Sequence, residues 1–216
     1  MTHRILIFAL PLLLTACGDG LDHHEETDEL GFRTVSATDP ATGQLEGEYI
    51  VYNPDGSLAS RGTYRDGQFD GPRTFYYPDG TPDIVQPYVA GRFDGEYLHY
   101  DSLGNLYQRG QYADNRMSGK WLRYYPGGAV EEEVTFADNM EQGPFREWYP
   151  DGQPKASGTY LDGDKEHGLL HLYTEAGALE RVMDCERARC ATIWTPDSSG
   201  RAPDGPAMTP PPGATD

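Results

Sequence analysis

The chain has 216 residues, with 35 Asp and Glu against 17 Lys and Arg, so its formal net charge is −18 at pH 7. Such an acidic chain is a poor partner for nucleic acid, because phosphate binding needs basic patches. After the N-terminal segment, no stretch shows a sustained periodicity of 3.6 residues, which argues against helices and for an all-β chain.

Residues 1–16 are predicted to form a signal peptide. Arg4 supplies a basic start, and an apolar run follows from Ile5 to Leu14. The run is shorter than the roughly 20 apolar residues that a membrane-spanning helix needs, whereas its length suits a secretory signal. Removal of this segment, which holds one Arg and no acid, leaves a mature chain of net charge −19.

Leu14-Thr15-Ala16-Cys17 resembles the lipobox at the cleavage site of bacterial lipoproteins. The resemblance implies that Cys17 is acylated, accepts palmitate label and becomes the new N-terminus. Two or three acyl chains anchor a protein stably, whereas one does not. Gly18, where Asp would mark retention at the inner membrane, indicates an outer-membrane lipoprotein facing the periplasm or the surface. A Gram-positive host would instead anchor it to its single membrane, and an ordinary secretory signal with a chance cysteine is the alternative.

Two terminal segments of the mature chain are predicted to be disordered. Residues 17–31 form an acidic tether, and residues 195–216 form a tail with six prolines and almost no large apolar side chain. The folded domain is expected to span residues 32–194. His23 and His24, next to two glutamates, could bind a metal, but a solvated tether without fixed geometry explains them better.

Glycines and aromatic residues recur with a period of 24 residues, lengthened to 25 before the sixth unit. The first glycines of the units are Gly47, Gly71, Gly95, Gly119, Gly143 and Gly168. The second glycines are Gly56, Gly80, Gly104, Gly128, Gly152 and Gly177. One aromatic register comprises Tyr52, Tyr76, Tyr100, Tyr124, Trp148 and Tyr173, and the other comprises Tyr64, Tyr88, Tyr112, Phe136 and Tyr160.

Each unit is predicted to be a β-hairpin. In the unit that starts at Gly71, Pro78-Asp79-Gly80 is typical of a turn, and β-forming residues flank it. The turn to the next unit needs a left-handed backbone, because glycine or asparagine follows aspartate there. These dipeptides are Asp66-Gly67, Asp114-Asn115, Asp138-Asn139 and Asp162-Gly163. The result is about twelve strands in an antiparallel meander.

The aromatic registers are expected to be mainly structural, because a hairpin alone cannot bury a core and must pack on its neighbours. Rings that contact rings from unit to unit would supply this packing. A ladder of solvent-facing rings that binds sugars or a partner chain is the functional alternative.

The units resemble the bacterial variant of the MORN repeat, most clearly at residues 119–128 and 143–152, over residues 47–184 as a whole. The resemblance implies an elongated antiparallel array of hairpins. Bacterial relatives are often labelled antitoxin-like (YwqK-type), others serve as scaffolds or membrane-associated binding modules, and no catalytic residues carry over. Gln86 and Val134 replace the mid-unit glycine of other units, so we expect less freedom for a bulge there. The sixth unit is eroded at Thr174-Glu175.

Cys185 and Cys190 are the two cysteines other than Cys17. An exported protein meets an oxidising compartment, so a short-loop disulfide is predicted, with free thiols or metal binding as alternatives. Cys185 stands at an aromatic position of the repeat, and Cys190 is expected in the following turn. The bond would cap the array where aromatic packing ends.

The sequence offers little for catalysis or metal binding. His167 and His171 lack the spacing of a zinc motif, and no serine has the context of a hydrolase nucleophile. Carboxylates cluster in turns, where turn chemistry explains them, although sequence does not exclude a glycosidase pair. No loop matches the spaced ligands of a calcium site. We therefore expect neither enzyme activity nor a cofactor or metal.

Three functions remain. The leading hypothesis is a non-catalytic lipoprotein, attached to the membrane by its lipid, that presents a β-repeat surface to another protein of the cell envelope. The second is an antitoxin or immunity-like protein that neutralises a toxin. The third is binding of a glycan or of peptidoglycan through the aromatic ladder.

Overall fold

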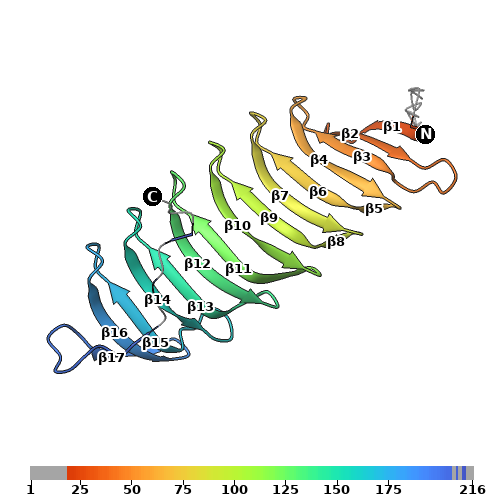
Figure 1. Ribbon diagram of the computed structural model, residues 1–216. Coiled ribbons are helices and arrows are strands. Elements are labelled where there is room, and N and C mark those ends of the chain that lie inside the picture. Colours follow the sequence, from red (N-terminus) through yellow and green to blue (C-terminus); the bar gives the residue numbers. More distant parts are fainter. Residues whose placement is uncertain (1–18, 206–207, 209–210, 213–216) are drawn as a thin grey trace, which may run out of the picture. The chain divides into compact units, whose positions relative to one another are not determined.

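The structure is a computed structural model that describes residues 19–205, 208 and 211–212. Regular structure in these residues consists of 17 β-strands (Figure 1), which confirms the all-β prediction. The described residues contain no helix that is long and apolar enough to cross a membrane. Cys17 and the predicted signal peptide lie outside the described residues.

The chain divides into two compact units, Met1–Arg92 and Phe93–Asp216. The first unit contains β1 (Asp22–Thr27), β2 (Arg33–Thr38), β3 (Gly47–Tyr52), β4 (Leu58–Arg65), β5 (Gln68–Phe69), β6 (Gly71–Tyr76) and β7 (Pro82–Val89). β8 (Arg92–Phe93) contains the boundary. The second unit contains β9 (Gly95–Tyr100), β10 (Leu106–Ala113), β11 (Arg116–Tyr124), β12 (Val130–Ala137), β13 (Met140–Trp148), β14 (Pro154–Tyr160), β15 (Gly168–Tyr173), β16 (Leu179–Glu186) and β17 (Arg189–Trp194).

Within each unit, strands pair antiparallel with their neighbours in chain order, which confirms the predicted meander. The structure has more strands than the twelve expected. β1 and β2 precede the first repeat, and β17 follows the last. β5 and β8 are two-residue strands that end two residues before the first glycine of a repeat.

The turns follow the predicted chemistry. In the hairpin of β6 and β7, Gly80 has φ +88°, and its N–H donates to the carbonyl oxygen of Tyr77 at 2.9 Å. Asp79 Oδ1 accepts a hydrogen bond from the N–H of Thr81 at 2.9 Å, so the aspartate side chain also stabilises the turn. The predicted left-handed backbone between repeats is confirmed. Positive φ angles occur at Asp66, Gly67, Asp114, Asn115, Asp138, Asn139, Asp162 and Gly163.

The two faces of the sheet carry different side chains. On one face, which we call the ring face, Tyr49 lies 5.1 Å from Tyr64 between ring centroids in the first unit. In the second unit the corresponding face, given the same name, holds a core that contains Trp121 and Phe145, each 2% exposed. Alternation along the strands puts the residue after each of these side chains on the opposite face.

The glycines in the middle of the repeats lie beneath rings of the ring face. Gly62 pairs with Tyr49, Gly110 with Tyr97, and Gly158 with Phe145. A Cβ on Gly158 would lie 2.7 Å from Phe145 Cε1, which is closer than real Cβ contacts. These glycines therefore provide space for aromatic side chains.

The expectation that Val134 hinders a bulge is wrong. β12 shifts register against β13 between Val134 and Phe136, just as β10 shifts against β11 between Arg109 and Gln111. Gln86 lies in regular pairing with Arg73 of β6. The shift thus belongs to the repeat geometry and does not depend on glycine.

The expected acidic tether is partly a β-strand, which corrects the prediction of disorder at residues 18–31. β1 pairs with β2 over its whole length, and Asp28 Oδ1 accepts the N–H groups of Leu30 and Phe32 at 2.9 Å in the turn between them. Arg33 Nη1 lies 3.2 Å from Glu25 Oε1 across the pair. The charges that suggested a solvated tether suit a strand at the edge of a sheet, where charge discourages further pairing.

A disulfide joins Cys185 and Cys190, as predicted. The prediction that Cys190 lies in a turn is wrong, because Cys190 is the second residue of β17 and pairs directly with Cys185 of β16. The turn itself is formed by Arg187 and Ala188, with φ angles of +50° and +66°. Neither residue favours this left-handed region, and the disulfide closes the hairpin directly beside it.

Candidate functional site

The rings of the ring face contact one another. In the first unit, Phe69 lies 4.1 Å from Tyr64 and 5.2 Å from Tyr88 between ring centroids. In the second unit, Trp121 lies 5.5 Å from Tyr112, and Phe145 is stacked on Tyr160 at 4.1 Å. Ring-to-ring packing of this kind favours a structural role for the aromatic register that begins at Tyr64.

Carboxylates on the ring face are paired with cations. Glu132 and Glu147 are partners across β12 and β13, where Arg123 Nη2 lies 3.1 Å from Glu132 and Lys155 Nζ lies 2.7 Å from Glu147. Burial raises the pKa of Glu132, and it also raises the pKa of the nearby Tyr160. The cations explain why these acids are tolerated in a half-buried position.

The second unit has a surface of a different kind on the opposite face, which we call the tail face. One row of paired residues crosses this face at right angles to the strands. In order from β9 to β17, the row is Leu98, Arg109, Leu122, Glu133, Arg146, Ser157, His171, Val182 and Trp194. Every strand of the second unit contributes one residue, so the row is a direct product of the regular register.

The centre of the row is charged and buried. Glu133 is 5% exposed and lies 2.9 Å from Arg146 Nη1 and 3.1 Å from Lys120 Nζ. A carboxylate so deeply buried needs both cations, because an unpaired charge there would be strongly unfavourable. The two ion pairs hold β11, β12 and β13 together on this face.

An apolar patch flanks the row. Leu122, Val130 and Trp148 form a small buried cluster in which Trp148 is 1% exposed. Tyr124 packs beside them, and so does Met208 of the C-terminal tail. Trp148 and Tyr124 belong to the aromatic register that begins at Tyr52, so part of that register lines the tail face.

The tail lies on this face, which corrects the prediction of a disordered C-terminal segment for its described residues. The indole N–H of Trp194 donates to Gly200 O at 3.2 Å, and His171 Nε2 lies 2.9 Å from Pro203 O. Gly205 lies against the imidazole of His171. The tail thus returns from β17 across the strands of the second unit.

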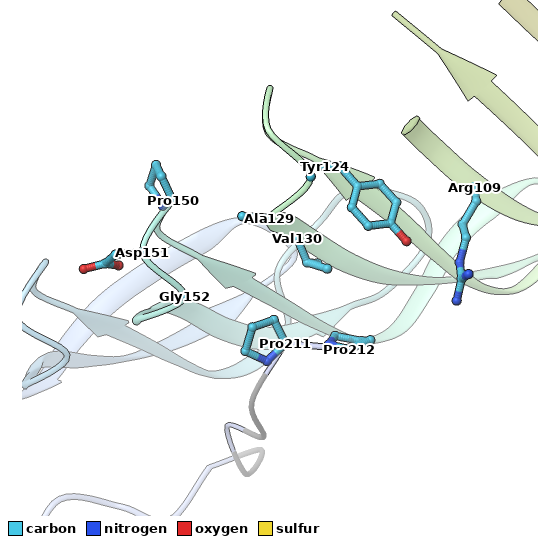
Figure 2. A pocket seen from close by; sticks show the side chains of 10 residues that line it. Arg109, Tyr124, Ala129, Val130, Pro150, Asp151, Gly152, Pro211 and Pro212 are labelled. Carbon is cyan, nitrogen blue, oxygen red and sulfur yellow. The ribbon is translucent and has the colours of Figure 1, made fainter. Parts of the chain in front are cut away.

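A hollow remains where the described tail ends. Figure 2 shows Pro211 and Pro212 on one side of it and Tyr124, Ala129 and Val130 on the other. The side chain of Arg109 reaches toward the hollow from β10, where it is exposed. Arg109 and Pro212 therefore line this hollow together, at the end of the described part of the tail.

The histidines are distributed over separate places. His23 lies 3.0 Å from Asp19, His24 lies 2.8 Å from Thr38, and His171 is buried beneath the tail. No group of three or more His, Cys, Asp or Glu that could hold a metal occurs among the described residues. The structure does not bring the histidines that the sequence singled out into one site.

The comparison with protein families matches the repeat. The model of the MORN repeat variant covers residues 45–66, 93–114, 117–138 and 141–162. These four segments of the chain are MORN-variant repeats. The matched segments begin two residues before Gly47, Gly95, Gly119 and Gly143, while the repeats at Gly71 and Gly168 are not matched. MORN repeats are generally non-catalytic binding scaffolds, and no catalytic family was found. No curated protein matches the chain.

The sequence of the MORN-variant repeats gave no signal for the row or for its occupation by the tail. The row depends on register across nine strands, and its members differ in chemistry from strand to strand. One signal was present in the tail. Met208 is an isolated large apolar residue between Pro206 and Pro210, which is unusual in a segment with no structural role.

Proposed function

We propose that this MORN-variant protein is a lipid-anchored, non-catalytic scaffold that binds another protein of the cell envelope through its tail face. The observation that carries the proposal is that this face buries a segment which contributes no strand to the sheet. A face that holds one such segment has the shape and the hydrogen-bonding groups to hold a peptide. The lipobox-like Leu14–Cys17 supports attachment to the outer membrane.

The proposal is tested by photo-crosslinking in intact cells. A crosslinking amino acid replaces Arg109, which is exposed at the open end of the row. The matched control is Thr192, an exposed residue of β17 paired with Met183 of the ring face. We expect a specific envelope protein to be captured from Arg109 and not from Thr192.

Two results contradict the proposal. Equal capture from both positions would show that the tail face has no special role. Capture of glycan strands with purified sacculi, unchanged by substitution of Arg109, would instead favour the aromatic ring face as a sugar-binding surface.

A further inference from the structure

The tail is held on the sheet by separate contacts spaced along the row. Moving away from β17, the contacts are made at Trp194, at His171, and then at the patch of Leu122 and Trp148. Pro212 lies farther on, near Arg109. The tail therefore follows the row itself, over most of its length.

Among the described residues of the tail, these contacts do not form a β-ladder. Two hydrogen bonds join the row to the described tail, and each runs from a side chain, the indole of Trp194 or the imidazole of His171, to a carbonyl oxygen of the tail. Proline lacks an N–H and cannot donate to a ladder, so a segment with six prolines suits this mode of binding. Its removal would leave the hydrogen bonds between the strands unchanged.

Two positions of the tail are selective. A Cβ on Gly205 would lie 2.0 Å from His171 Cε1, so the main chain must lie directly on the imidazole ring. Met208 occupies the apolar patch formed by Leu122, Val130 and Trp148. An unbranched, flexible thioether fills an irregular apolar gap well. The groove therefore requires a residue without a side chain at His171, and it accepts an apolar side chain at the patch of Leu122, Val130 and Trp148.

The groove is longer than its described occupant. Beyond Pro212, Arg109 is exposed and Leu98 is half-buried. A chain that bound along the whole row would contact both residues in addition to those that the tail covers. An extended proline-rich segment loses little conformational entropy on binding, because its backbone is already restricted.

We propose that the tail face of the second unit is a docking groove for an extended, proline-rich segment of a partner protein with one unbranched apolar anchor, and that the tail of this chain occupies the groove as a displaceable internal ligand. This inference rests on the proposed function, and it names the chemistry of the partner and the means of its regulation. A partner binds by displacing the tail. Its apparent affinity is therefore its intrinsic affinity multiplied by the fraction of molecules in which the groove is open.

The test uses the full mature chain in detergent and a fluorescein-labelled synthetic peptide of residues 200–212. Gly205→Val places a side chain against His171 and releases the tail, and Met208→Asp releases it by a second route. Ser199→Val, at an exposed position of the tail, is the control. We expect both releasing variants to bind the peptide at least tenfold more tightly than the wild type and the control, because a tethered competitor acts at a high effective concentration.

A peptide with Met208→Asp should bind none of the proteins tightly. Equal affinity of the peptide for the wild type and for both releasing variants would overturn the inference. Self-association of the wild type with protein concentration, reversed by the peptide, would identify a second copy as the occupant and overturn the assignment to a partner. The peptide-binding assay is independent of the crosslinking experiment at Arg109. Failure of the docking-groove inference and failure of the proposed function can therefore be told apart.

Discussion

Gly110 lies directly beneath the indole of Trp121, and a Cβ at this glycine would sit 2.0 Å from Trp121 Cδ2. The two residues belong to neighbouring strands, β10 and β11. Trp121 is the centre of the ring-face core in the second unit, with contacts to Tyr97, Tyr112 and Phe136. The absence of a side chain at Gly110 therefore provides the space that the indole of Trp121 fills.

Gly110→Ala should destabilise the protein by about 1–3 kcal/mol, because the extra methyl group overpacks a filled core. The measurement is the free energy of unfolding in urea. Gly62→Ala is the matched control, because a Cβ there would lie 3.1 Å from its nearest neighbour and requires only a small adjustment. A double variant with Trp121→Leu should lose less stability than the sum of the losses of the two single variants, and additive losses would contradict direct contact between the two positions.

Replacement of Cys185 and Cys190 by Ser should lower the melting temperature by a few degrees. The disulfide closes a short loop, so the loss of chain entropy in the unfolded state corresponds to about 2 kcal/mol. The strand content of the earlier repeats should be unchanged. Reactive thiols at both positions in the unreduced, denatured protein would show that the bond does not form.

The turn beside the disulfide offers a companion experiment. Arg187→Asn combined with Ala188→Gly should stabilise the hairpin of β16 and β17 by about 1 kcal/mol, because Asn-Gly favours two successive left-handed residues. The gain should be larger in the variant without the disulfide, where the turn alone sets the register. Thermal unfolding of the four proteins measures both effects, and a loss of stability would contradict the assigned turn.

Stability should fall when the pH drops below about 4. Hydrogen bonds from nearby residues of their own turns lower the pKa of three turn carboxylates, Asp55, Asp79 and Asp101, from the ordinary value of 3.8. Their contribution is complete above 3.8 and is lost as the pH falls through the lower folded values. Asn at all three positions should flatten this part of the curve, as measured by urea unfolding at a series of pH values.

Glu132 and Glu141 should have the opposite effect at slightly higher pH. Burial raises the pKa of both carboxylates above 4.5, so the folded state binds protons more readily than the unfolded state. Acidification from neutral pH should therefore first increase stability and then reduce it once the turn aspartates are protonated. Glu132→Gln should shrink the initial rise, and an unchanged rise would contradict the assignment.

Cys17→Ser should abolish the incorporation of radioactive palmitate and leave an unprocessed or soluble exported protein. Cysteine supplies the thiol that accepts lipid, and serine does not. Continued labelling of this variant would remove the basis for the proposed localisation. Cys185→Ser serves as the control and should keep its label, because that cysteine is engaged in the disulfide.

The repeats could be predicted from sequence because their signals are local. Each second glycine, such as Gly80, and each Asp-Asn or Asp-Gly pair marks a turn whose backbone only a few residues accept. The tail and β1 could not be predicted in the same way. Met208 packs against Leu122 and Trp148, which are distant in sequence, and β1 gains its order from pairing with β2. Composition alone therefore indicated disorder for both segments.

The meander also sets an order of events during biosynthesis. Each strand of the repeats pairs with strands next to it in the chain, so hairpins can form one after another as the polypeptide emerges. Met208 reaches its patch only after residue 208 has been made, and until then it does not cover Leu122 and Trp148. A newly made molecule therefore passes through an interval in which the partner proposed above would meet no internal competitor.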